Sequence, residues 1–173
     1  MTDRSDFERL FRSVHTDLHG YVVRRMGLTG AEDVVADALA TVFARWGDAP
    51  ASLDEQRAWA FGITHHKLQE AFRKRSRAIA VVSVLHAGPT ASAAADDEVA
   101  ALDRARRLLE RLPTAERNAV YLTVVAGLTS AETARILECS VTAVTSRVSR
   151  ARHSLRAILE AEKGKEASAR VVS

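Results

Sequence analysis

The segment that most constrains the fold is TSAETARILECSVTAVTSRVSRAR, at residues 129–152, because it combines two helix starts with very little chain between them. Thr129 is followed three residues later by Glu132, a pairing that caps the free backbone N–H groups at a helix start. Ser140 marks a second start, and a turn at Glu138–Ser140 is all that separates the two helices. Two helices joined by such a turn form a helix-turn-helix, which is what this segment predicts.

The second helix of this segment has two different faces when its residues are placed at about 100° per residue. The apolar face is formed by Val141, Val144, Val148, Ala151, Leu155 and Ile158. On or beside the opposite face lie the residues expected to contact DNA, which are Thr142, Thr145, Ser146, Arg147, Ser149 and Arg150. Short hydroxyl side chains let a helix approach base edges, and arginines can reach guanine or phosphate. The alternative, a solvated amphipathic helix with surface arginines, does not account for the capped helix and tight turn in front of it.

The composition favours helices, and the positions of the charged residues are more informative than the net charge. Of the 173 residues, 47% are hydrophobic, while glycine (8) and proline (3) are scarce, so a packed helical core is expected. A net charge of +3 is too small to indicate a nucleic-acid partner by itself. The basic residues are nevertheless concentrated at 67–77 and 146–156, which points to two contacts with a polyanion.

Several chemistries are not expected from this sequence. Cys139 is the only cysteine, which excludes an internal disulfide and a cysteine-based zinc site. His15 and His19 are four residues apart, but no third ligand is evident, so we interpret both as ordinary histidines and expect no metal and no other cofactor. With no nucleophile–base pattern and no phosphate-binding glycine loop, the chain is not expected to be an enzyme. The lack of a long apolar run or a signal peptide predicts a soluble, cytoplasmic protein without membrane insertion.

Helix starts and apolar spacing together predict the secondary structure. Four Ser/Thr-x-x-Glu patterns are expected to cap helices, and they begin at Ser5, Thr29, Ser52 and Thr129. In the first half, apolar residues at helical spacing predict helices at about 6–26, 31–46 and 53–77, with a loop at 47–52. The expected buried stripes of the first two helices include Phe7, Phe11, Val34 and Phe43.

These features predict an all-α fold of two small helical domains joined by a flexible linker, with the helix-turn-helix in the C-terminal one. The expected boundaries are 1–77 for the first domain, 78–100 for the linker, 101–160 for the second domain and 161–173 for a frayed tail. The apolar segment 78–85 leaves two interpretations open. It either continues the third helix or packs on a domain, or it binds a partner.

The third helix contains RAWAFGITHHKLQEAFRKRSR, at 57–77, a mixture of aromatic and basic residues suited to holding phosphates and unstacked bases of single-stranded DNA. It is preceded by FERLFRSVHTDLHGYVVRRM and AEDVVADALATVFARW, and followed by ALDRARRLLERLPTAERNAVYL and the helix-turn-helix. With these motifs in this order, the chain resembles the group 4 bacterial sigma factors, the extracytoplasmic-function type of the sigma-70 family. The resemblance covers nearly the whole chain.

The resemblance implies a promoter-specificity subunit of bacterial RNA polymerase, with sigma region 2 in the first domain and region 4 in the second. In the family an acidic-apolar helix binds the clamp helices of the largest polymerase subunit, and the matching residues here are Asp33, Val34 and Asp37. The third helix would contact the promoter −10 element through Arg57, Trp59, His66, Lys67, Glu70, Arg73 and Lys74. The loop 47–52 would form a pocket for an extruded base, and the helix-turn-helix would bind the −35 element as duplex.

The sequence departs from the family pattern at four positions. Family members usually have asparagine at His66 and aspartate at Glu70, which leaves the −10 base preference open. Glycine is common in the turn at Glu138, and lysine is common in the recognition helix at Thr145, so these two weaken a simple phosphate-contact picture. The acidic linker residues 96–98 would follow the RNA exit path, or they are simply solvated. An anti-sigma factor is an expected partner, besides core polymerase and promoter DNA.

Two other functions fit parts of the chain. A stand-alone helix-turn-helix regulator explains the second half equally well, but it does not need Asp33, Asp37 or the aromatic-basic helix. An adaptor that binds polymerase or another partner without reading DNA would not need arginines at 147 and 150.

Overall fold

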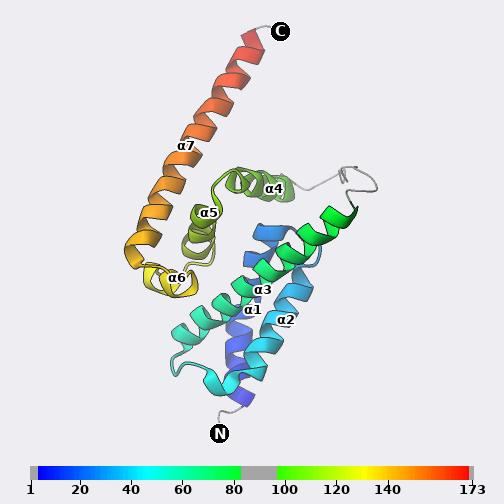
Figure 1. Cartoon of the computed structure of the whole chain (residues 1–173), viewed down its shortest axis with the longest axis vertical. Helices are drawn as coiled ribbons and strands as arrows, with labels where there is room; N and C mark the ends of the chain where they lie inside the picture. The colour runs from blue at the N-terminus through cyan, green and yellow to red at the C-terminus, as the bar shows by residue number, and fades with distance from the viewer. Residues whose placement is uncertain (1–3, 83–96, 172–173) are drawn as a thin grey trace. The chain divides into compact units, whose positions relative to one another are not determined.

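The computed structural model describes the backbone of residues 4–82 and 97–171, and every secondary-structure element within them is helical. The chain divides into two compact units, residues 1–99 and 100–173, each described here by itself. The elements of the first unit are α1 (Arg4–Met26), α2 (Ala31–Ala44), the 3-10 helix η1 (Trp46–Asp48) and α3 (Leu53–Val82) (Figure 1). Those of the second are α4 (Asp97–Glu110), α5 (Thr114–Val120), the π-helix η2 (Tyr121–Val125), α6 (Ser130–Ile136) and α7 (Val141–Val171). The expected all-α fold with two helical domains is confirmed.

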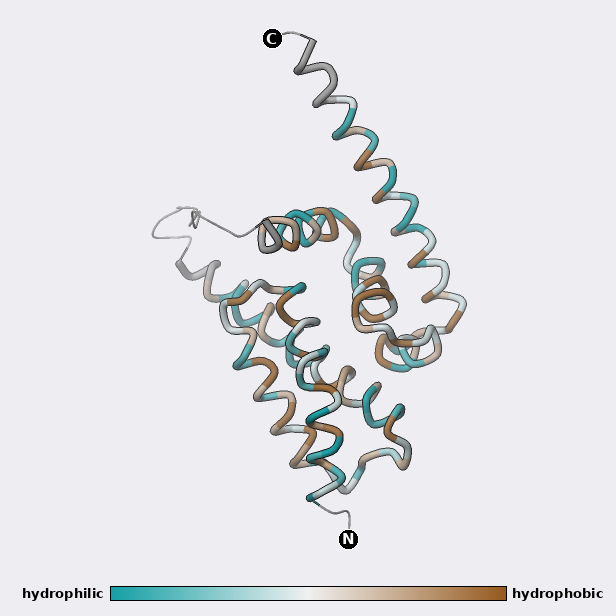
Figure 2. The backbone as a smooth tube through the Cα atoms, turned by 180° about the vertical axis from the view of Figure 1, so that it is seen from behind, coloured by the Kyte–Doolittle hydropathy of each residue, from teal (hydrophilic) through white to brown (hydrophobic). Residues whose placement is uncertain are grey.

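In the first unit, α1, α2 and α3 pack against one another around an apolar core. On α1, Leu10, Val14 and Leu18 recur every four residues and are fully buried, as helical spacing predicts. Tyr21 of α1 meets Phe61 of α3 edge to face, with ring centroids 5.6 Å apart. Figure 2 shows the resulting alternation of polar and apolar residues along each helix.

The core of this unit also contains polar groups that link α1 to α3. The hydroxyl of Tyr21 lies 2.9 Å from Nδ1 of His65, and both side chains are buried. Burial, and then the nearby charges of Arg25 and His66, lower the pKa of His65 to about 3. The guanidinium of Arg25 is itself buried and lies 5.5 Å from the ring centroid of Phe72. These contacts fix which face of α3 turns towards the core.

In the second unit, α5 and α6 both pack on α7. Leu112, Val120 and Ala151 form a buried apolar cluster between the α5 region and α7. After α5 the chain passes directly into the π-helix η2, and Gly127 then adopts a left-handed φ of 68°. Glycine carries no Cβ penalty in that conformation, so it is well suited to end this helical stretch.

The helix-start signals gave mixed results. Thr129 forms a complete capping box with Glu132, and the Ser52 hydroxyl accepts a hydrogen bond from the Glu55 N–H, at 3.3 Å. The predictions for two other patterns were wrong. Helix α1 already begins at Arg4, so Ser5 lies inside its first turn, and α2 is preceded by left-handed Gly30 with no side-chain cap from Thr29.

Two helices are longer than expected. Helix α3 ends at Val82 rather than Arg77, so the part of segment 78–85 that is described continues the third helix; residues 83–96 lie outside the described chain. Helix α7 continues to Val171 through the expected frayed tail. The sequence there is rich in Ala, Glu and Lys, which favour helix, and Arg111 pairs with Glu162 of α7, with Nη1 and Oε1 2.7 Å apart.

Candidate polymerase and nucleic-acid interfaces

The acidic side chains of α2 are on the surface, while its apolar ones face the core. Asp33 and Asp37 are exposed, and Val34 is buried with 8% of its surface exposed. Of these three residues, therefore, only the two carboxylates present themselves to a partner in this structure. Asp37 already has a neighbour, because its Oδ2 lies 3.0 Å from Nζ of Lys67 on α3.

Helices α1, α2 and η1 form an aromatic groove that the sequence did not predict. We define the aromatic groove by Phe7, Phe11, Phe43 and Trp46. The ring of Phe7 lies 4.9 Å from that of Phe43 and 5.4 Å from that of Trp46, centroid to centroid. Two hollows of about 670 and 660 Å³ share Phe7, Phe11 and Phe43 as lining residues.

The aromatic groove corrects the expected cores of α1 and α2. Phe11 is 38% exposed and Phe43 is 56% exposed, although both belong to the predicted buried stripes. The apolar residues of each helix cover a wider arc than one contact face can bury, and the excess is left on the surface. The sequence does contain a signal for the groove. Phe7 and Phe11 are four residues apart on α1 and are additional to the apolar residues that already form its buried face.

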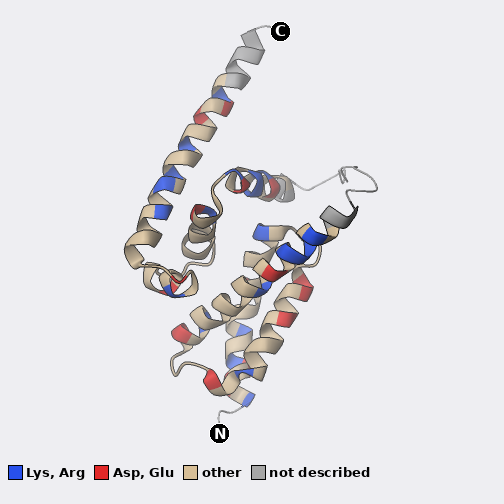
Figure 3. Ribbon diagram, in the orientation of Figure 1, with Lys and Arg blue, Asp and Glu red and all other residues tan. Residues whose placement is uncertain are grey.

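Part of the predicted −10 site gathers on one face of α3. Trp59, His66 and Arg73 follow one another at seven-residue intervals, so they share a face of the helix. Glu70 and Lys74 lie within the same turns and pair with each other, with Oε1 and Nζ 3.3 Å apart. Figure 3 shows the basic residues collected on the C-terminal half of α3.

The structure places two other predicted −10 residues elsewhere. Arg57 Nη2 lies 3.5 Å from Asp17 Oδ2 on α1, and its guanidinium stands 4.9 Å from the ring centroid of Phe61. Lys67 is directed to Asp37 on α2. These two side chains therefore contact neighbouring helices rather than joining the face that carries His66.

The loop 47–52 begins within η1 and is tied to the start of α3. Gln56 Nε2 donates to the backbone oxygen of Pro50 at 2.8 Å. The Ser52 hydroxyl lies 2.8 Å from Glu55 Oε2. Trp46, which precedes the loop, is buried, and its Nε1 has no hydrogen-bond partner within the described part of the chain. The role of this loop in holding a base stays a prediction.

The helix-turn-helix is confirmed in its local geometry. Helix α6 ends at Ile136 and α7 begins at Val141, so four residues form the turn. Glu138 has a left-handed φ of 49°, which is the conformation that glycine favours at this point. The Ser140 hydroxyl accepts a hydrogen bond from the Ala143 N–H at 3.1 Å and caps α7.

Helix α7 presents most of its predicted DNA-contacting residues to solvent. Thr142, Thr145, Ser149 and Arg150 are exposed, while Ser146 and Arg147 are half-buried. On the opposite face Val144 and Ala151 are fully buried. Val141 departs from the predicted apolar face, because it lies in the first turn of α7 and is 47% exposed.

Both arginines of this face contact their own domain. Arg147 Nη1 lies 3.2 Å from Sγ of Cys139 in the turn, so the half-buried cysteine has a polar contact. Arg150 Nε donates to Glu116 Oε1 on α5 at 3.0 Å. Sequence spacing could not reveal either contact, because each depends on how the turn and α5 pack against α7.

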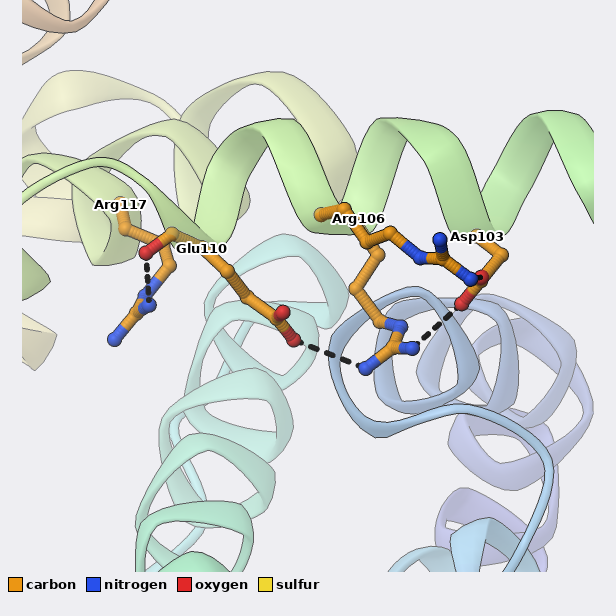
Figure 4. A network of polar contacts seen from close by, with 5 residues as sticks. Asp103, Arg106, Glu110 and Arg117 are labelled. Atoms are coloured by element: carbon orange, nitrogen blue, oxygen red, sulfur yellow. Dashed lines mark hydrogen bonds and ion pairs between the residues drawn. The ribbon is translucent and has the colours of Figure 1, made fainter. Parts of the chain in front are cut away.

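Helix α4 carries its own network of charges. Arg106 lies between Asp103 and Glu110, and Arg107 also pairs with Asp103 (Figure 4). Hydrogen bonds from Arg106 and then Arg107 hold the pKa of Asp103 below its usual value. These pairs are spaced three or four residues apart on one helix, so they support α4 itself rather than form a binding site.

Two absences apply only to the described residues. No three His, Cys, Asp or Glu side chains among them lie close enough together to hold a metal ion. No helix among them combines the length and the apolar character needed to cross a membrane.

Comparisons with known proteins match both units. The Sigma-70 region 2 family matches residues 10–78, and the Sigma-70, region 4 family matches residues 102–155. The RNA polymerase sigma factor CnrH of Cupriavidus metallidurans is 34% identical over 79% of this chain and 77% of its own length.

Solved structures agree with these matches. The structure of CnrH in complex with the cytosolic domain of CnrY is similar over 92% of this chain and 90% of that one, with a TM-score of 0.69 and 25% identity. The sigma factor RpoE from Bartonella quintana, in complex with the anti-sigma factor NepR, is similar over 90% of this chain and 97% of that one, with a TM-score of 0.71 and 26% identity. The chain therefore belongs to the sigma-70 family and, being also 30% identical over 59% of its length to the ECF RNA polymerase sigma factor EcfG of Rhodopseudomonas palustris, is an RNA polymerase sigma factor of the extracytoplasmic-function type. The match of its first half to region 2 disfavours a stand-alone regulator.

Proposed function

We propose that this sigma factor binds core RNA polymerase through α2, the −10 element through α3 and the −35 element through α7. The observation that carries the proposal is the separation of charge within the first unit. Exposed Asp33 and Asp37 lie on α2, whereas exposed Arg73 and Lys74 lie on α3. An acidic surface suits a basic protein partner, and a basic helix suits phosphates.

The −10 role is supported best for the face of α3 that carries Trp59, His66 and Arg73. An aromatic ring followed by a basic stretch is what single-stranded DNA requires, because bases stack on rings while cations hold the backbone. Extruding a base costs a few kcal/mol, which stacking and phosphate contacts offset. The predicted contacts of Arg57 and Lys67 remain proposals that require each to leave its present aspartate partner.

The aromatic groove extends the proposed polymerase surface. The two hollows along it are together lined on α1 from Arg4 to His19, which corresponds to about 22 Å of helix, so they can accept an amphipathic helix of about four turns. We propose that a helix of core polymerase occupies it next to Asp33 and Asp37. The related factors have solved structures in complex with other proteins, CnrH with the cytosolic domain of CnrY and RpoE with the anti-sigma factor NepR. An anti-sigma factor that covers the same groove would keep this chain from polymerase.

The proposal describes binding and not catalysis. The chain would act by differential affinity for promoter DNA and by stabilising separated strands, while polymerase performs the chemistry. Because polymerase and chromosome share the bacterial cytoplasm, the proposal places the chain there as well.

Two measurements on the purified 173-residue chain test these binding roles. Tagged chain should retain core polymerase in a pull-down, and the complex should protect both promoter elements from cleavage in a footprint. If the chain protects duplex DNA but retains no polymerase, the proposal is contradicted and a stand-alone helix-turn-helix regulator is favoured. Retention of polymerase with no protected DNA would instead favour an adaptor.

A further inference from the structure

Glu116 is a nearly buried carboxylate beside the face of α7 that carries Arg150. Its side chain is 11% exposed, and Arg150 Nε lies 3.0 Å from its Oε1. The side chain of Arg150 is nevertheless 61% exposed. One end of the guanidinium is therefore held against the protein while most of the arginine faces solvent.

Because the guanidinium is rigid and planar, the bond to Glu116 sets the orientation of the whole group. Arginine has five N–H donors in a rigid planar fork, and only the Nε donor takes part in the bond to Glu116. The four N–H donors on the two Nη atoms take no part in that bond, and two of them, one from each Nη, form the end-on outer edge of the plane. A fixed Nε bond thus sets the direction of the edge that can form paired hydrogen bonds with a phosphate or with guanine.

Glu116 itself stands on a firmly packed part of the domain. It lies in the first turn of α5, four residues before Val120, so the two side chains point to the same side of that helix. Val120 packs with Ala151, the neighbour of Arg150, in the buried cluster between α5 and α7. The position of the carboxylate relative to Arg150 is therefore set by the core.

We propose that Glu116 is a positioning residue that aims the guanidinium of Arg150 at duplex DNA. The proposal rests on the proposed binding of DNA by α7. Residues at the DNA-facing positions near it are short, as with Thr145 and Ser149, so the exposed Arg150 is a long cationic side chain that an ordered contact there can use. Holding it in advance removes part of the rotamer entropy that DNA binding would otherwise cost.

The test compares the dissociation constants of variants of the whole 173-residue chain for one DNA duplex. The probe is a 30-bp duplex from the upstream half of a promoter that the wild-type chain and core polymerase transcribe. Arg150→Ala should weaken binding about tenfold, within the range for loss of one good arginine contact. Glu116→Ala and Glu116→Leu, which remove the acceptor with and without leaving a space, should each weaken it about fivefold. Glu116→Gln keeps an acceptor oxygen and should stay within about twofold of wild type.

A double-mutant comparison separates positioning from a general structural effect. In the Arg150→Ala background, Glu116→Leu should cause no further loss, because there is no guanidinium left to aim. Equal losses in both backgrounds would show that Glu116 only supports the fold and would overturn the proposal. An unchanged or higher affinity of Glu116→Leu in the wild-type background would also overturn it, because the carboxylate would then be neutral or would restrain Arg150. If Arg150→Ala alone changes nothing, the DNA contact proposed for Arg150 is wrong, and with it this inference, whether or not the chain supports transcription.

Discussion

Lys67 Nζ on α3 lies 3.0 Å from Asp37 Oδ2 on α2, so a residue proposed to bind DNA is paired with one proposed to bind polymerase. The Asp37 side chain is 61% exposed and that of Lys67 is 26% exposed. Exposed ion pairs contribute little to stability, about 0–1 kcal/mol. A partner that binds Asp37 can therefore release Lys67 at small cost.

The first prediction concerns Asp37→Asn. Because Asp37 is exposed, the free energy of unfolding should change by less than about 1 kcal/mol, while affinity for core polymerase falls at least about fivefold through loss of a charge at the interface. Chemical denaturation and a titration with labelled core polymerase measure the two effects. The matched control is Asp17→Asn, which frees Arg57 from a similar exposed pair at 3.5 Å but lies on α1. Equal losses of polymerase affinity in both variants would show that Asp37 has no special role.

The second prediction concerns the turn of the helix-turn-helix. Glu138 holds a left-handed φ of 49°, and a side chain in that conformation costs about 1 kcal/mol relative to glycine. Glu138→Gly should therefore stabilise the chain by roughly 0.5–1 kcal/mol in urea denaturation. Glu160→Gly, in the middle of α7, should destabilise it by a similar amount, since glycine is unfavourable inside a helix. A destabilising Glu138→Gly would mean that contacts of the glutamate outweigh its backbone strain.

Hydrophobic periodicity predicted the existence of most helices, because buried apolar residues must recur at helical spacing whatever the tertiary detail. The interiors around Leu10, Val14 and Val144 follow directly from it. It could not tell that Phe11 and Phe43 stay exposed, because a stripe wider than one contact face looks the same in the sequence as a broader core.

For the candidate site, the sequence predicted which residues share a helix face but not which residues they contact. Spacing along α3 places His66 and Arg73 on one face, since this needs only a regular helix. The partners of Lys67, Arg147 and Arg150 come from other segments, so no local pattern contains them. Thr29 shows the converse, because its capping pattern is present but the backbone enters α2 through Gly30 instead.

The third prediction compares two threonines with the same sequence pattern. Thr129 accepts from the Glu132 N–H at 3.2 Å, so Thr129→Ala should lower the free energy of unfolding by about 1 kcal/mol. Thr29 makes no such cap, so Thr29→Ala should change it by no more than a few tenths of a kcal/mol. Urea titrations of both variants check the difference. Equal costs would mean that the caps differ less than their geometry indicates.

The fourth prediction concerns pH. The pKa of His65 falls from 6.5 to about 3 on folding, so between these values the unfolded chain binds more protons than the folded chain. The contribution of His65 to stability is therefore intact above about pH 6.5 and is lost as pH falls from there towards 3. Linkage gives a loss of about 1 kcal/mol between pH 7.5 and pH 5.5.

The control for this pH effect is His65→Asn, whose side-chain oxygen can replace Nδ1 as the partner of the Tyr21 hydroxyl without titrating. The measurement is the difference in unfolding free energy between pH 7.5 and pH 5.5 in urea. It should be smaller in the variant than in the wild type by about 1 kcal/mol. The same pH dependence in both proteins would show that other groups are responsible.

The central claim is that this chain gives core RNA polymerase its promoter specificity, and transcription in vitro tests it most directly. The template set is genomic DNA fragments, and the readout is the 5′ ends of transcripts made by core polymerase with and without the purified chain. We expect defined starts that require the chain, and a strong reduction of these starts with the double variant Arg73→Ala/Lys74→Ala, which removes two exposed cations from α3. Transcript ends that are the same with and without the chain would contradict the account.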